Sequence, residues 1–137
     1  MGVVLDSTVI IAAERAGKNP RNVIEDVTRS LSDTDATLSV VTVMELAHGI
    51  ERSNSVARRT SRERFLEELL QQFSVEPVTI PIALRAGKID GSLRAKGTSI
   101  ALGDLLIGAT ALELGYSVVT HNARHFEAIP DLAVTRL

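Results

Sequence analysis

Three acidic residues that are far apart in the sequence, Asp6, Glu45 and Asp104, each stand where a short apolar run gives way to a stretch with helical spacing. If the fold brings them together, their carboxylates repel one another unless a divalent cation or a shared proton neutralises them. Mg²⁺ and Mn²⁺ prefer oxygen ligands and commonly bind carboxylates together with substrate phosphates. The first hypothesis is therefore a metal site that hydrolyses phosphodiester bonds with metal-activated water.

Each acid also has a purely structural explanation. Asp6 can be the N-cap of a helix, and Glu45 follows Thr42 at the spacing of a capping box. Asp104 at the start of a helix is favoured by the helix dipole. No single acid proves a metal site. The three together favour one, because helix N-termini also keep carboxylates ionised.

The length and composition exclude several classes of protein and of active site. A chain of 137 residues fits one domain, here residues 1–137, and the absence of cysteine excludes disulfides, thiolate ligands and a cysteine nucleophile. No apolar run approaches the roughly 20 residues that span a bilayer. We therefore expect a soluble protein of the cytoplasm that has no membrane partner.

Arginines cluster in the middle of the chain, although the net charge of −2 argues against binding nucleic acid by bulk electrostatics. One interpretation is a solvated helix face, because glutamates alternate with these arginines. The other is an edge that contacts the phosphates of RNA. The candidates for RNA contact are Arg52, Arg58, Arg59, Arg62 and, later in the chain, Arg124.

Short apolar strands alternate with amphipathic helices, which predicts an α/β sandwich around a mainly parallel sheet. The expected strands are Gly2–Leu5, Thr37–Val41, Val75–Ile80, Val118–Thr120 and Leu132–Val134. The expected helices are Asp6–Ala16, Arg21–Leu31, Thr42–Ile50, Arg58–Phe73, Pro81–Lys96 and Gly103–Leu114. Pro77 interrupts the third strand, which indicates a sheet edge. Ligands of such sheets bind outside the carboxyl ends of the strands, where the strand order reverses.

Two other interpretations, a zinc site and a phosphoacceptor receiver domain, have less support in the sequence. His121 and His125 have a ligand-like spacing, but no cysteine or glutamate motif accompanies them, which disfavours zinc. A phosphoacceptor receiver domain has a similar size and alternation. It would normally carry paired acids after the first strand, where this chain has Asp6 followed by Ser7.

Four ordered blocks extend over nearly the whole chain: Val4-Leu5-Asp6-Ser7-Thr8, Thr42-Val43-Met44-Glu45-Leu46, Gly103–Ala111 and Thr120–Phe126. Together they resemble the motif blocks of PIN-domain ribonucleases, particularly VapC-type toxins. The resemblance implies a three-layer α/β/α domain and a Mg²⁺- or Mn²⁺-dependent endoribonuclease. It also implies that the protein is the toxin of a toxin–antitoxin pair, dimeric and inhibited by a small VapB-like antitoxin.

By the same resemblance, Asp6, Glu45 and Asp104 are the three metal-binding acids. The family's fourth catalytic position, often aspartate, aligns with Asn122, whose neutral carbonyl could orient water or a metal ligand but contributes less negative charge to the site. Ser7 and Thr120 would supply hydroxyls that support the metal ligands.

Two further expectations follow. Because of Asn122, an inactive PIN fold that only binds RNA or protein remains an alternative. The segments Pro20–Leu31 and Arg58–Phe73 are expected to form an apolar groove for a helix of the antitoxin.

Overall fold

The structure is a computed structural model that describes residues 1–32 and 34–137. Strands and helices alternate along these ranges. The strands are β1 (Gly2–Leu5), β2 (Asp35–Ser39), β3 (Ser74–Glu76), β4 (Ser117–Thr120) and β5 (Val134–Arg136). The helices are α1 (Ser7–Arg15), α2 (Pro20–Leu31), α3 (Val40–Glu51), α4 (Val56–Gln72), α5 (Ile80–Ala95), α6 (Leu102–Leu114) and the short 3₁₀ helix η1 (Ala123–His125).

The five strands form one sheet in the order β3-β2-β1-β4-β5, and every pairing is parallel. The predicted parallel α/β sheet is confirmed, with β3 at an edge. The chain builds outward from β1 to β3 and then crosses to β4, so the order reverses between β1 and β4. Asp6 follows β1 and Asn122 lies just beyond β4, which places both at this switch point. The receiver-type order 2-1-3-4-5 is not observed.

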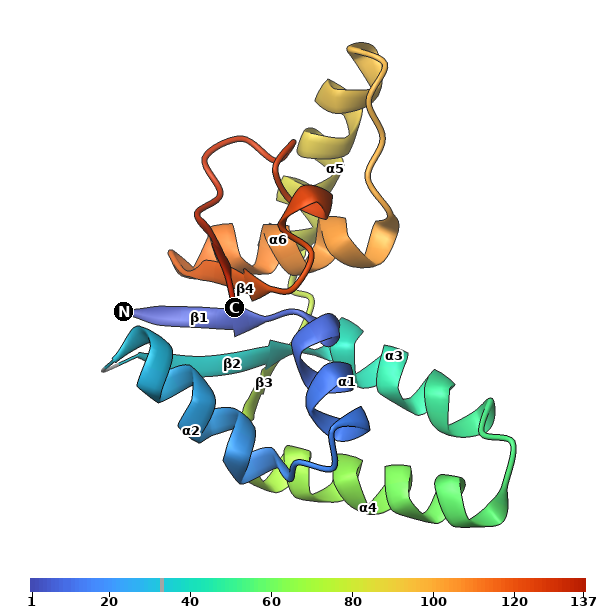
Figure 1. Cartoon of the computed structure of the whole chain (residues 1–137). Coiled ribbons are helices and arrows are strands. Elements are labelled where there is room, and N and C mark those ends of the chain that lie inside the picture. The colour runs from blue at the N-terminus through green and yellow to red at the C-terminus, as the bar shows by residue number, and fades with distance from the viewer. Residues whose placement is uncertain (33) are drawn as a thin grey trace.

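Helices cover both faces of the sheet. Figure 1 shows α5 and α6 on one side and α1, α2 and α4 on the other, with α3 running away from the carboxyl ends of the strands. The β-branched run of β1 is buried on both faces: Val3 and Leu5 pack toward α1, α2 and α4, while Val4 packs with Ile107 of α6. The three-layer α/β/α architecture is thus confirmed.

Several predicted boundaries are wrong by a few residues. The strand β2 ends at Ser39, whose hydroxyl caps α3 by accepting from the backbone N–H of Val41. The helix therefore begins at Val40, and the predicted capping box of Thr42 and Glu45 does not exist. Val40 and Val41 favoured a strand because they are β-branched, but the serine cap prevails locally. The strand β3 ends before Pro77, and β5 begins two residues late, at Val134.

The predicted groove between α2 and α4 is also wrong. The apolar residues of these helices, Val23, Val27, Phe65 and Leu69, are buried in one core cluster with the sheet. Because these side chains pack together in the core, α2 and α4 form no open groove between them in the described part of the chain. In the described ranges, no helix has the length and apolar character needed to cross a membrane.

Candidate functional site

Asp6 is fixed more firmly than the other two candidate acids. It directly follows β1, and only 1% of its surface is exposed. It stands at the N-cap position of α1, yet its side chain makes no capping hydrogen bond. Instead, the hydroxyls of Thr8 and Thr120 each donate to its Oδ2 atom over 2.8 Å. The carboxylate is thus oriented by side chains, and its second oxygen, Oδ1, has no hydrogen bond within the described ranges.

The two hydroxyls that hold Asp6 are themselves oriented by the backbone. Thr120 Oγ1 accepts from the backbone N–H of Asn122 over 2.9 Å, and Thr8 Oγ1 accepts from that of His121 over 3.2 Å. Since each threonine oxygen accepts an N–H, its own hydrogen is free to point at Asp6. Residues that follow β4 therefore orient an acid that follows β1.

Glu45 lies more than one turn inside α3, where helix capping cannot explain it. The hydroxyl of Ser7 donates to its Oε2 atom over 3.0 Å. Burial raises the pKa of Glu45 above its ordinary value, and the negative charges of Asp6 and Asp104 raise it further, while the Ser7 hydrogen bond lowers it. The three acids are therefore close enough to repel one another.

Asp104 lies in the first turn of α6 and faces His125. The Nδ1 atom of His125 is 3.2 Å from Asp104 Oδ2. Burial raises the pKa of Asp104, and the charge of Asp6 adds to the rise, whereas His125 lowers it. Proximity to His125 thus offsets part of the cost of keeping a negative charge here.

The donor set suits a hard divalent cation. Each carboxylate directs one oxygen to a neighbouring group and leaves the other without a hydrogen bond among the described residues. In residues 1–32 and 34–137, however, no three acidic, histidine or cysteine side chains already stand where they could share one ion. Mg²⁺ keeps several waters and needs only one or two carboxylates, so water can connect the remaining acid to the ion.

Gly103 leaves room for the Glu45 carboxylate. A Cβ atom at Gly103 would lie 3.3 Å from Glu45 Oε1 and 3.6 Å from Val41 Cγ1. Any side chain here would press on the oxygen of Glu45 that is left open. The glycine before Asp104 therefore brings α3 and α6 together at the site.

The supporting residues are only partly those expected from the sequence. Ser7 contacts Glu45 and Thr120 contacts Asp6, as the resemblance implied. The Asn122 amide nitrogen lies 3.0 Å from His125 Nε2 and reaches Asp104 only through that ring. Sequence reasoning missed two contacts: it gave Thr8 no role in the site and weighed His125 only as a zinc ligand. The one-turn spacing of Asn122 and His125 was the available signal for the second.

The chain is similar in sequence and fold to known proteins. A family model described as "PIN domain" matches residues 3–132. The chain belongs to the PIN domain family. A relative, "Ribonuclease VapC" of Rickettsia bellii, is 33% identical over 135 residues, covering 98% of this chain and 95% of the relative. The "tRNA(fMet)-specific endonuclease VapC" of Salmonella typhimurium is 30% identical over 105 residues, or 77% of each chain.

Solved structures agree with this assignment. The VapBC-1 structure from nontypeable Haemophilus influenzae matches with a TM-score of 0.82 and 29% identity, covering 99% of this chain and 98% of the matched chain. VapBC2 from Rickettsia felis, bound to a promoter DNA fragment, matches with a TM-score of 0.85 at 21% identity, which shows the shared fold. This PIN domain is thus of the VapC type.

The arginine cluster divides into paired and unpaired side chains. Arg59 of the PIN domain lies 2.7 Å from Glu51 and 3.0 Å from Glu63. Arg62 donates to the carbonyl of Gly49 and to Ser53, and it lies near Glu14. Both are therefore engaged within the fold.

The remaining candidates, Arg52, Arg58 and Arg124, are not in ion pairs within the described ranges. These side chains are free to contact phosphates. RNA contact by any of the five arginines stays a prediction.

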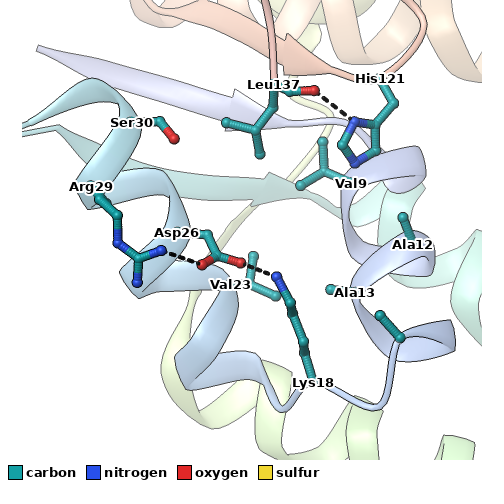
Figure 2. Close-up of a pocket in the computed structure, with 11 residues that line it drawn as sticks. Val9, Ala12, Ala13, Lys18, Val23, Asp26, Arg29, Ser30, His121 and Leu137 are labelled. Atoms are coloured by element: carbon teal, nitrogen blue, oxygen red, sulfur yellow. Dashed lines mark hydrogen bonds and ion pairs between the residues drawn. The ribbon is translucent and has the colours of Figure 1, made fainter.

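A cavity of about 360 Å³ lies between α1 and α2. Figure 2 shows Asp26 paired with Lys18 and Arg29 on one side, and the His121 ring bonded to the backbone oxygen of Leu137 on the other. Alanine and valine side chains form its apolar wall. Among the described residues that line it, none is a candidate acid, so this cavity is separate from the carboxylate site.

Proposed function

We propose that this PIN domain is a Mg²⁺- or Mn²⁺-dependent endoribonuclease that hydrolyses RNA phosphodiester bonds. The observation that carries the proposal is the convergence of Asp6, Glu45 and Asp104 at the switch point of the sheet, where each leaves one oxygen without a hydrogen bond to any described residue. The names of the similar VapC ribonucleases support RNA as the substrate class. We further propose that the protein acts in the cytoplasm.

We assign a separate role to each group of residues in the site. Asp6, held by Thr8 and Thr120, provides a fixed anionic oxygen. Glu45 and Asp104 provide the remaining negative charge; burial raises their pKa values, and a nearby cation would favour their ionised forms. When bound, Mg²⁺ or Mn²⁺ supplies Lewis acidity at the phosphate and lowers the pKa of water to make a nucleophile. Unpaired arginines such as Arg58 steer the RNA backbone.

Cleavage of RNA by the purified protein tests the proposal. We expect products in Mg²⁺ or Mn²⁺ and none after chelation, and we expect the Asp6→Asn variant to be inactive. Its fold should persist, because an asparagine oxygen can still accept from both threonines. Asp90→Asn is the matched control, since Asp90 is paired with Arg94 on α5. Equal activity of the parent and Asp6→Asn would refute the assignment.

We propose that the protein is the toxin of a toxin–antitoxin pair and binds a VapB-like antitoxin. The solved neighbours include VapBC structures, which supports such a partner. A groove between α1, α3 and α4 offers an apolar surface that leads to Glu45, with Ile11, Leu46, Phe65 and Leu66 among its lining residues. A segment bound there would block access to the acids.

Coexpression with the neighbouring reading frame tests the antitoxin proposal. We expect the two proteins to copurify and a Leu66→Glu variant to lose the partner. Expression of the chain alone should arrest growth, and Asp104→Ala should relieve the arrest. Unimpaired growth, together with no copurifying partner, would count against the toxin assignment.

We also propose a homodimer, because several large apolar side chains are exposed on helices near the site. They are Val40 and Met44 on α3, Ile80 and Leu84 on α5, and Leu102 on α6. Exposed apolar side chains of this kind are typical of subunit contacts when they are contiguous. Light scattering after chromatography should give a dimer for the parent and a monomer for Leu84→Glu, whereas Val56→Glu at the start of α4 should stay dimeric. A monomeric parent would overturn the proposal.

A further inference from the structure

A continuous set of hydrogen bonds and close polar contacts links the acid that follows β1 to the acid that begins α6. Thr120 Oγ1 donates to Asp6 and accepts from the backbone N–H of Asn122. The side-chain amide of Asn122 lies 3.0 Å from Nε2 of His125, whose Nδ1 lies 3.2 Å from Asp104 Oδ2. The histidine is thus the last member of a path that ends on a candidate metal ligand.

The chemistry of the two ends fixes the direction of these bonds. An ionised carboxylate can only accept, so the Nδ1 atom of His125 must carry a hydrogen and donate to Asp104. In a neutral ring Nε2 is then an acceptor, which is satisfied by the amide N–H of Asn122. Asn122 therefore selects the ring form that can orient Asp104.

Core packing holds the histidine in place. The next residue, Phe126, is fully buried and packs with Ile107 of α6. Gly108 lies one turn after Asp104 on the same helix, and a Cβ atom there would lie 2.5 Å from Ile129. The segment that carries His125 is thus pressed against α6, which carries Asp104. The contact is built into the fold even though 53% of the His125 side-chain surface is exposed.

We propose that His125 is a positioning residue that orients Asp104 for the divalent cation, and that Asn122 acts through His125 by fixing its hydrogen on Nδ1. The inference rests on the proposed metal-dependent function and changes the role of the fourth position. The resemblance aligned Asn122 with the family's fourth acidic position, from which it could orient water or a metal ligand, whereas the geometry makes it a support for the histidine. Groups that orient metal ligands in this way typically change metal affinity by about 10- to 100-fold when removed.

The first measurement uses the metal-free protein. Nitrogen-15 NMR of the histidine rings, at a pH where His125 is neutral, should show the hydrogen on Nδ1. In Asp104→Ala the amide of Asn122 should still hold the hydrogen on Nδ1, whereas in the double variant Asp104→Ala/Asn122→Ala the hydrogen should move largely to Nε2. A hydrogen on Nε2 in the parent would overturn the proposal without any reference to activity.

The second measurement is calorimetric titration with Mn²⁺. We expect His125→Ala to weaken binding by about tenfold or more, and His125→Asn to restore most of the affinity, because its amide N–H can take the place of Nδ1–H. His121→Ala is the matched control: that ring contacts the backbone of Leu137 and should not affect Mn²⁺ binding. Melting temperatures of all variants check that they fold.

The outcomes separate this inference from the proposed function. Equal Mn²⁺ affinity of the parent and His125→Ala would overturn the role of His125, even if the parent cleaves RNA. Equal losses in His125→Ala and His125→Asn would make the ring a metal ligand and overturn the positioning role. A parent that binds no Mn²⁺ would overturn the proposed function and, with it, this inference.

Discussion

Asp6 differs from Glu45 and Asp104 in how firmly the protein holds it. Asp6 is buried and accepts two hydroxyl hydrogen bonds, each of which is oriented by a backbone N–H of the segment that follows β4. Glu45 and Asp104 are half-buried, and each has one side-chain partner. The sheet therefore fixes one acid in advance, while the two helical acids have room to move.

This contrast explains why the site has acidic residues but no set of three already placed for one ion. Burial and mutual repulsion raise the pKa values of Glu45 and Asp104, so the metal-free protein holds their charges at a cost. A divalent cation would remove that cost. Asp6 would then be the fixed point around which the other two adjust.

The largest loss of RNA cleavage is expected from removing the negative charge of Asp6. Asp6→Asn keeps an oxygen for Thr8 and Thr120 but loses the negative charge that the cation needs. We expect the rate of RNA cleavage to fall by about 1,000-fold, at the upper end of what a single electrostatic contact provides, with little change in melting temperature. A loss smaller than that of Glu45→Gln would reverse the proposed ranking of the acids.

A smaller loss of metal affinity is expected from removing a hydrogen bond to Asp6 while keeping its negative charge. Thr120→Val removes a donor to Asp6 and the acceptor for the Asn122 N–H, with little change in shape. Mn²⁺ affinity measured by calorimetry should fall by about 10- to 100-fold. Thr110→Val is the control, because Thr110 is also buried but bonds only to the carbonyl of Leu106 in its own helix. Equal affinities of Thr120→Val and the parent would show that Asp6 needs no such support.

Gly103→Ala should disturb the helical acids and spare Asp6. The added methyl group would lie 3.3 Å from Glu45 Oε1, so the Glu45 carboxylate must shift by a few tenths of an ångström. We expect the rate of RNA cleavage to fall by roughly tenfold, as for a small misplacement of a catalytic group. Gly91→Ala on α5 meets nothing within 4 Å and should stabilise the protein slightly. Full activity of Gly103→Ala would mean that the position of Glu45 is not critical.

The smallest expected effect is a pH-dependent change in the melting temperature of Glu45→Gln. Glu45 has a pKa above its ordinary value of 4.5, so its ionisation destabilises the fold increasingly as the pH rises past 4.5. Glu45→Gln removes this charge and can still accept from Ser7. In metal-free buffer at pH 8 we expect its melting temperature to exceed that of the parent by about 1–2 °C, and the difference should vanish near pH 4. A difference that grows toward low pH would contradict the direction of the pKa shift.

The sequence predicted the features that depend on local pattern. The buried run of β1, the all-round apolar helix α6 and the position of Asp6 at a strand end follow from hydrophobic periodicity, and the motif blocks identified the family. The start of α3 was misplaced because Val40 and Val41 have strand propensity, while the Ser39 cap is decided by one hydrogen bond.

The supporting contacts could not be predicted in the same way. Thr8 and Thr120 meet at Asp6 only because β1 and β4 are neighbours in the sheet, which sequence spacing does not reveal. The contact of His125 with Asp104 depends on the close packing at Gly108. Such long-range pairs require the fold.

Titration of the metal-free protein with Mn²⁺, compared with Asp6→Asn under the same conditions, tests the central claim most directly. If the three acids form a metal site organised around Asp6, the parent binds Mn²⁺ and Asp6→Asn shows no measurable binding while remaining folded. Equal binding by the two proteins, or no binding by either, would contradict the account.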